Sequence, residues 1–246
     1  MIVSLPMYDR PELHGAFDRL WSAIRQELKA GPVKLSRDSN VWQDWVSRDL
    51  LLSQTCGLPF RAKLHDKVAL VGTPDHGLAL SNSGYYCSVF VAHKDDPRTA
   101  PLENADAVLA YNEPMSQSGW AAAEAYARDN GFAFTRFVQT GSHAASAKTV
   151  AEMSADIAAL DVVSWKLIQR YESFAEKLRV IGHTEQTPAL PFITAKNCDP
   201  TKIFEAIANA IERLSQEDRD TLCLQGVVKM TPEEYLAIPL PLSSPC

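Results

Sequence analysis

Apolar residues recur every three or four positions in two stretches of this chain, one at residues 11–30 and one near the C-terminal end. Such spacing places apolar side chains on one face of a helix. The positions are Phe17, Leu20, Trp21, Ile24 and Leu28 in the first stretch and Phe204, Ile207, Ile211 and Leu214 in the second. Both stretches are therefore predicted to be amphipathic helices.

Short apolar runs alternate with helical periodicity along the rest of the chain. The predicted strands are MIVSLP, DLLLSQ, KVALVGT, YYCSVFVAH, DAVLAYN, FAFTRFVQT, DIAALD and LRVIGHT. Further helices are predicted from about Gly119 to Asn130, after Gly141 and after DIAALD. Repeated alternation of strand and helix indicates an α/β fold with mostly parallel sheets.

Two proline-punctuated stretches predict a division into lobes. Residues 85–108 run from a strand into a Pro- and Asp-rich loop, and residues 178–195 run from a strand into a second such loop. We predict one lobe made of residues 1–88 and 184–246, with residues 89–183 inserted as a second lobe. Open α/β sheets take ligands at the carboxyl ends of their strands, so a ligand site is expected in a cleft between the lobes.

The composition narrows the class of protein. Of 246 residues, 46% are hydrophobic and 22% are charged, which is ordinary for a soluble globular protein. The net charge of −6 shows no basic surface of the kind that binds phosphate backbones, so nucleic acid is not expected as a partner. The apolar runs are far shorter than the ~20 residues of a membrane-spanning helix.

The N-terminal residues and the cysteines bear on the compartment. The sequence MIVSLPMYDRPE lacks the features of a secretion signal, so the chain as written is expected in the cytoplasm. A periplasmic address is expected instead if Met1 takes the place of a removed signal. The five cysteines show neither metal-ligand spacing nor a disulfide framework, which predicts unpaired thiols and no bound metal.

Cys56 raises the question of catalysis. The sequence QTCG places a glutamine two residues before a Cys-Gly pair, and His143 lies further along the chain. A cysteine nucleophile needs a nearby histidine and a group that orients it. The predicted lobes separate Cys56 from His143, and Pro59 follows the cysteine by three residues. We therefore interpret Cys56 as a loop residue and predict no enzymatic activity.

Two predicted turns from a strand to a helix carry serine. Residues 116–119 read SQSG, and residues 141–143 read GSH. Serine hydroxyls and the unpaired N–H groups at a helix start both favour an anion. Serine is also a good helix N-cap, so capping alone is the alternative interpretation. His143 is expected to donate to an anion, either as a neutral ring or as a cation.

Six motifs together resemble one protein family. They are LLLSQTCG, SGYYCSVFVAHKD, AYNEPMSQSGW, TGSHAASAKTV, ADIAALDVVSW and TPALPFIT. In this order, they are similar to the phosphonate, phosphite and phosphate type of solute-binding protein of ABC transporters, which has the type II periplasmic-binding fold. The resemblance implies two lobes, each a mixed, mostly parallel sheet flanked by helices. It also implies closure over a small oxyanion without a cofactor, and an ABC transporter permease as the partner.

The resemblance implies roles for individual residues in the second lobe. The positions that match the anion-gripping residues of the family are Ser116, Ser118, Gly119, Ser142 and His143. Gln117 stands where the family has threonine, which bears on the identity of the ligand. Asp161 matches a position that hydrogen-bonds the ligand, although it also fits the role of a helix N-cap.

Further candidates lie in or near the first lobe. Tyr85 matches a tyrosine that lines the cleft in the family, and a core aromatic at a hinge is the alternative interpretation. Parallel-sheet geometry alone directs the loops after the first and third strands toward the cleft. Their residues are Met7, Tyr8, Gln54 and Thr55. By contrast, Trp42, Trp45 and Trp165 are expected to pack in the core.

Two other functions on the same fold stay open. A cytoplasmic sensor would pass closure on to a protein partner. A thiamine-precursor pyrimidine synthase would need a lysine for pyridoxal phosphate and a histidine cluster, whereas the six histidines are scattered. Closure is expected to use residues 86–93 and 179–188 as the hinge.

Overall fold

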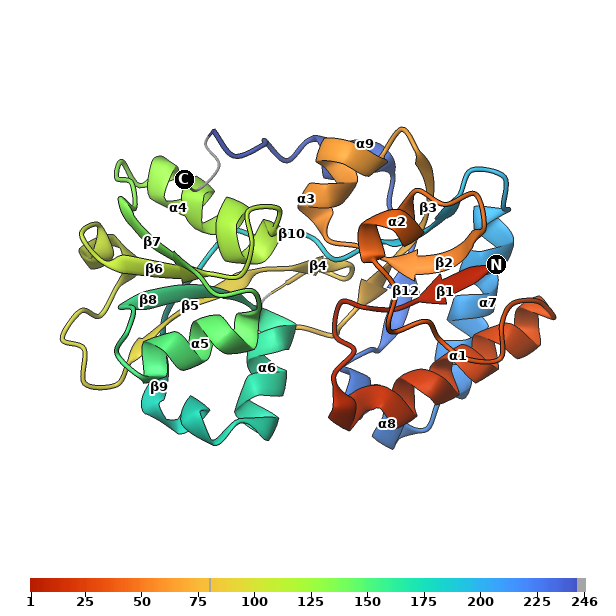
Figure 1. Ribbon diagram of the computed structural model, residues 1–246, viewed down its shortest axis with the longest axis horizontal. Helices are drawn as coiled ribbons and strands as arrows, with labels where there is room; N and C mark the ends of the chain where they lie inside the picture. Colours follow the sequence, from red (N-terminus) through yellow and green to blue (C-terminus); the bar gives the residue numbers. More distant parts are fainter. Residues whose placement is uncertain (80, 243–246) are drawn as a thin grey trace. The chain divides into compact units, whose positions relative to one another are not determined.

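The computed structural model of the protein describes residues 1–79 and 81–242, and the chain divides into two compact units (Figure 1). Unit 1 comprises Met1–Tyr85 and Pro188–Ile238, and unit 2 comprises Tyr86–Thr187 and the segment that begins at Pro239. The sequence predicts this last segment as part of the first lobe. In the structure it groups with unit 2, where the Leu242 N–H donates to Glu124 Oε1 (3.4 Å).

The sheet of unit 1 has the strand order β1-β2-β11-β3-β12. β1 and β2 pair in parallel, whereas β11 is antiparallel to both of its neighbours and β12 is antiparallel to β3. The strands are β1 (Ile2–Ser4), β2 (Leu50–Gln54), β3 (Val68–Asp75), β11 (Phe192–Ala195) and β12 (Gly226–Val228).

The predicted amphipathic helices are the long helices of unit 1. α1 (His14–Leu28) and α7 (Pro200–Arg213) pack against each other, and α7 also contacts β3 and β12 (Figure 1). Their apolar faces are buried, with Trp21 and Ile207 at most 1% exposed. The shorter helical segments are η1 (Pro11–Leu13), α2 (Val41–Trp45), α3 (Gly57–Pro59), η2 (Phe60–Leu64), α8 (Gln216–Leu222) and α9 (Pro232–Leu236).

The sheet of unit 2 has the strand order β7-β6-β8-β5-β9. β6 is parallel to β7 and β8, whereas β5 is antiparallel to β8 and β9. The strands are β5 (Ser88–His93), β6 (Val108–Tyr111), β7 (Arg136–Gln139), β8 (Ile157–Asp161) and β9 (Leu178–His183). The helical segments are η3 (Pro101–Asn104), η4 (Gln117–Ala121), α4 (Ala122–Asp129), α5 (His143–Ala151), α6 (Val162–Tyr171) and η5 (Ser173–Lys177).

Both sheets are mixed, as predicted, but they are not mostly parallel. The strands that lead directly into helices, β6, β7 and β8, are parallel to one another. The antiparallel strands β5, β9 and β11 lie next to the places where the chain passes between the units. Alternation of strand and helix in a sequence identifies strands that lead directly into helices, such as β6, β7 and β8. It carries no information about the direction of strands that lie beside a crossing between the units.

Buried residues line both faces of the unit 2 sheet, because neighbours along each strand alternate between faces. Val89 and Val91 belong to the core formed with α5 and α6, whereas Phe90 packs in the core on the opposite face with Trp120. The core next to α5 is rich in alanine: Ala110, Ala147, Ala151, Ala155 and Ala158. Such small side chains let α5 approach β8 closely, and these two elements are in contact.

The tryptophans are packing residues, as predicted. Trp45 and Trp165 are buried in the cores of units 1 and 2, respectively. Trp42 is half-buried and lies edge-on to Trp45, with ring centroids 4.9 Å apart. These three rings therefore pack against other residues of their own units.

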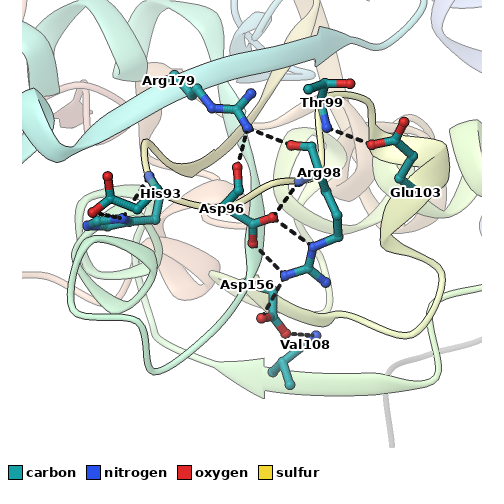
Figure 2. A network of polar contacts seen from close by, with 9 residues as sticks. His93, Asp96, Arg98, Thr99, Glu103, Val108, Asp156 and Arg179 are labelled. Atoms are coloured by element: carbon teal, nitrogen blue, oxygen red, sulfur yellow. Dashed lines mark hydrogen bonds and ion pairs between the residues drawn. The ribbon is translucent and has the colours of Figure 1, made fainter.

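A network of charged side chains fixes one end of the unit 2 sheet, as Figure 2 shows. Arg98 pairs with Asp96 and with Asp156, whose Oδ2 accepts from the Val108 N–H (2.7 Å). Arg179 donates to the carbonyl oxygens of Asp96 and Arg98. The hydrogen bond between Arg98 and Asp96 raises the pKa of the guanidinium and lowers that of the carboxyl. Since Asp156 precedes β8 and Val108 begins β6, the network holds the sheet at the end where these strands start.

The segments that leave unit 1 are anchored by hydrogen bonds. The short strands β4 (Tyr85–Tyr86) and β10 (Thr187–Pro188) pair with each other, and the boundary between the units falls inside both. Within unit 1, the Ala189 N–H donates to the Gly84 carbonyl (2.9 Å). Both segments are thus held together where they leave unit 1.

We expect Tyr235→Phe to lower the stability of unit 1 by about 1–3 kcal/mol, because it leaves two buried partners unpaired. The buried Tyr235 hydroxyl donates to the Ala189 carbonyl (2.7 Å) and lies 2.6 Å from Thr73 Oγ1. Urea unfolding measures the loss, and Tyr126→Phe, at a partly exposed tyrosine of unit 2, is the matched control. An equal effect of the two substitutions would contradict an anchoring role for Tyr235.

Candidate functional site

Three parallel strands of unit 2 end at one edge of the sheet, and each leads into a helix (Figure 1). β6 leads to η4 and α4, β7 leads to α5, and β8 leads to α6. Because the strands share one direction, the N-terminal ends of these helices gather at the same edge. The positive ends of three helix dipoles therefore point to this edge.

The first turn at this edge is the SQSG motif. Ser116 caps η4, and its Oγ accepts from the Gly119 N–H (2.9 Å). Ser116, Gln117 and Ser118 are all buried. A serine that caps a helix uses an oxygen lone pair, so its hydroxyl hydrogen remains available for another acceptor. The two interpretations from the sequence, capping and anion binding, are therefore compatible.

The second turn precedes α5. Ser142 caps this helix, and its Oγ accepts from the Ala145 N–H (3.1 Å). Gly141 has a φ of +88°, a left-handed conformation that favours glycine. The Thr140 hydroxyl lies 2.6 Å from Ser146 Oγ, which further fixes the turn.

A hydrogen bond joins the two turns. Ser118 Oγ lies 2.9 Å from His143 Nε2. Ser88, at the start of β5, donates from its Oγ to the Ser118 carbonyl (3.0 Å). Helix capping requires neither contact. The structure thus brings the predicted residues Ser118 and His143 together, and their contact with a ligand stays a prediction.

His143 is held in its neutral form. Burial lowers its pKa to about 4, so the ring is uncharged at neutral pH. The side chain as a whole is only half-buried, but Nδ1 is buried and has no hydrogen-bond partner among the described residues. If the ring proton is on Nε2, it is donated to Ser118, whose hydroxyl can then donate to a ligand. If the proton is on Nδ1, that nitrogen is the donor, so either tautomer leaves one N–H or O–H donor in this pair.

Asp161 ends β8 at the same edge. Its Oδ1 accepts from the N–H groups of Val163 (2.7 Å) and Ser164 (2.9 Å), and the residue is 1% exposed. The interpretation of Asp161 as the N-cap of α6 is confirmed. Its contact with a ligand stays a prediction.

Asn112 lies at the same edge and was not identified from the sequence. Its carbonyl accepts from the Gly141 N–H (2.9 Å). Its side chain lies against Gly119, where an added Cβ would be 2.0 Å from Asn112 Oδ1. Any larger residue at position 119 would therefore require the Asn112 side chain to move. The only sequence signal was an asparagine directly after a strand, which is also common in ordinary turns.

The candidates Tyr8, Gln54 and Thr55 belong to unit 1, and each is buried there. The Tyr8 ring lies edge-on to His76, with ring centroids 5.5 Å apart. Gln54 Nε2 donates to the Leu190 carbonyl (3.1 Å). Thr55 Oγ1 has no hydrogen-bond partner within the described parts of the chain. Their roles as ligand contacts stay predictions.

Tyr85 also belongs to unit 1, and it is half-buried. Its hydroxyl donates to Glu234 Oε1 (3.3 Å), at the start of α9. Burial and this carboxylate raise the pKa of Tyr85. Glu234 in turn accepts from the Thr231 N–H (2.7 Å). A ligand contact from the Tyr85 hydroxyl would therefore compete with Glu234.

Cys56 lies just before the short helix α3 in unit 1, where it is half-buried. His143 belongs to unit 2, and its Nε2 is bonded to Ser118. A Cys-His pair would need that nitrogen, or the buried Nδ1, next to the sulfur. The contacts of His143 therefore favour the interpretation of Cys56 as a loop residue.

The described ranges contain no membrane-spanning helix, metal cluster or disulfide. Every helix there is too short or too polar to span a bilayer. No three histidine, cysteine or acidic side chains in these ranges gather as a metal site requires. The cysteines in these ranges form no disulfide, and Cys246 lies outside the described residues.

Solved structures show the same fold. PhnD1 from Prochlorococcus marinus, in complex with methylphosphonate, is 15% identical with a TM-score of 0.77, over 97% of this chain and 95% of that chain. A binding protein component of an ABC phosphonate transporter from Pseudomonas aeruginosa is 16% identical with a TM-score of 0.73, over 97% and 83%. MatC from Rhodopseudomonas palustris, with bound malate, is 11% identical with a TM-score of 0.63, over 96% and 94%. The predicted type II periplasmic-binding fold is thereby confirmed.

The sequence matches one family over residues 52–235, well over half of the chain. The family is described as ABC transporter, phosphonate, periplasmic substrate-binding protein. The chain belongs to this family, and the resemblance drawn from the six motifs is confirmed. No curated protein matches the sequence.

We expect His143 to make the protein less stable as the pH falls from about 6.5 toward 4. The unfolded chain takes up a proton near the ordinary histidine pKa of about 6.5, whereas the folded chain does so only near 4. Between these values the unfolded state binds more protons, so acid favours unfolding. Because His143 is only half-buried, part of the effect is lost to solvent screening.

Urea unfolding at several pH values measures this effect. His143→Gln should lose less stability on acidification than the wild type, and His65→Gln, at an exposed histidine of unit 1, should follow the wild type. Parallel curves for wild type and His143→Gln would contradict the neutral, buried ring.

Proposed function

We propose that this protein binds a small tetrahedral oxyanion of the phosphonate class at the edge of the unit 2 sheet, as the substrate-binding component of an ABC uptake system. The bond between Ser118 and His143 carries the proposal, because it joins two helix starts that would otherwise be capped separately. Family membership supports uptake as the role. A transporter permease is then the partner, and the periplasm is the compartment.

The groups at this edge suit an oxyanion. Ser116 and Ser142 keep hydroxyl hydrogens while they cap, and the Ser118–His143 pair supplies one more donor. Hydrogen bonds to a charged group contribute about 1.5–3 kcal/mol each, and a helix start about 0.3–1 kcal/mol. After the cost of association, these contributions are sufficient for roughly micromolar affinity, near −8 kcal/mol.

Two observations support this class of ligand. The relative from Prochlorococcus marinus binds methylphosphonate, which supports a phosphonate here. Buried Gln117 occupies the middle of the serine motif, where its amide can select among anions of similar charge. We therefore expect a phosphonate or a close analogue such as phosphite, and we expect the protein to release it unchanged.

We expect Ser118→Ala and His143→Ala each to weaken binding roughly ten- to a hundredfold, or about 1–3 kcal/mol, because each removes a donor to the anion. A thermal-shift panel first identifies the ligand among methylphosphonate, aminoethylphosphonate, phosphite, phosphate, sulfate and malate. A ligand at 100 times its Kd stabilises the folded protein by about 2.7 kcal/mol. Calorimetry with the best ligand then gives the affinities.

Two variants of unit 1 are the controls. Ser215 caps α8 with the same geometry as the site serines, since its Oγ accepts from the Asp218 N–H (3.1 Å). Ser215→Ala should lower the melting temperature and leave affinity unchanged, and Cys56→Ser should change affinity by no more than a few-fold. If Ser118→Ala and His143→Ala both bind like the wild type, the serines only cap helices and the site lies elsewhere.

We expect ligand binding to make the protein more compact, because the boundary between the units falls within two short paired strands, where few backbone torsions need to change. Small-angle scattering with and without saturating methylphosphonate measures the radius of gyration. The same titration of Ser118→Ala, below its weakened Kd, controls for effects of the salt. A radius of gyration that is unchanged at saturation would argue against closure.

A further inference from the structure

Asn112 is the residue in contact with both serine turns. It follows β6, and its carbonyl accepts from the Gly141 N–H, which fixes the start of the turn that carries Ser142. Its side-chain oxygen lies against Gly119, within the turn that carries Ser116. Asn112 thus contacts one turn of the proposed anion site through its backbone and the other through its side chain.

The oxygen of this side chain lacks a donor. Asn112 Oδ1 is buried and accepts no hydrogen bond from any described residue. Its neighbour Gly119 presents only its Cα there, because the Gly119 N–H is already donated to Ser116 Oγ. A buried acceptor without a donor destabilises the folded state. A ligand that donates a hydrogen bond to this oxygen would remove that free-energy cost.

The other groups at the site are chiefly donors. Backbone N–H groups at the helix starts and the hydroxyls of Ser116 and Ser142 all favour a bare, negatively charged oxygen. Asn112 Oδ1 repels such an oxygen, whereas a P–OH group can donate to it. Asn112 Oδ1 and the Asp161 carboxylate, whose Oδ1 caps α6, thus lie as acceptors among several donors, an arrangement complementary to an oxyanion that keeps one proton.

We propose that Asn112 is a specificity residue of this site, whose Oδ1 accepts a hydrogen bond from a protonated oxygen of the ligand. The inference rests on the proposed function. The site would then take tetrahedral oxyanions that carry one negative charge and one P–OH group, such as hydrogen methylphosphonate. Ligands of equal charge and shape that lack the hydroxyl would be rejected.

A matched pair of ligands tests the proposal. Dimethylphosphinate is hydrogen methylphosphonate with a methyl group in place of the hydroxyl, and both carry one negative charge below the second ionisation of methylphosphonate. In calorimetry at such a pH, wild-type protein should bind methylphosphonate at least about tenfold more tightly. Asn112→Leu should bring this ratio close to one by weakening methylphosphonate, with dimethylphosphinate within a few-fold of the wild type.

The conservative variant separates specificity from a merely structural role. Asn112→Asp keeps an acceptor oxygen, so it should weaken both anions through charge repulsion and still prefer methylphosphonate. Circular dichroism confirms that each variant is folded, and if Asn112→Leu is not, the ratios of the wild type and Asn112→Asp decide.

The remaining outcomes have distinct meanings. A wild-type ratio near one overturns the proposal. Equal weakening of both ligands in Asn112→Leu also overturns the proposal. Asn112 would then have only a structural role, or its amide would be flipped so that Nδ2 donates to both ligands. Binding of neither ligand by the wild type would instead refute the proposed phosphonate function itself.

Discussion

The hydrogen bond between Ser118 and His143 is the contact on which the arrangement of the candidate site depends. β6 and β7 are parallel neighbours, which brings the turns that follow them to the same edge of the sheet. Parallel pairing alone leaves the relative positions of the two turns adjustable. The bond fixes them together with the Gly141 N–H donated to Asn112, and it also orients the imidazole, whose ring has lost its charge through burial. A neutral ring suits the proposed role of this site, which is to bind an anion and release it again.

The local part of the site could be predicted from the sequence, because each serine turn connects a strand to the helix that follows it directly in the chain. Ser116, Ser142 and Asp161 occupy N-cap positions, as such turns require. Asn112 and Ser88 could not be identified in this way. Asn112 matters through Gly119 and Gly141, and Ser88 through the carbonyl of Ser118, contacts that only tertiary packing creates.

The candidates in unit 1 show a second limit of the sequence. The position of Gln54 and Tyr85 next to strands indicates which edge of a sheet they approach, but not which distant segment meets them there. In the structure, Gln54 donates to Leu190 and Tyr85 to Glu234. Both partners come from the part of the chain that returns after unit 2. A polar side chain at a strand end can therefore bind a ligand or form a hydrogen bond with a distant segment. The sequence around the residue does not distinguish these two roles.

The alanine-rich core beneath α5 links the volume of distant side chains to the geometry of the anion site. Ala147 and Ala151 lie on α5, and Ala158 lies on β8, and all three are at most 2% exposed in one core. His143 is the first residue of the same helix. One additional methyl group at these alanines would have to be accommodated by movement of α5 away from the sheet. Under the proposed function, the volume of these alanines therefore affects ligand affinity as well as folding, although none of them is among the candidate ligand contacts.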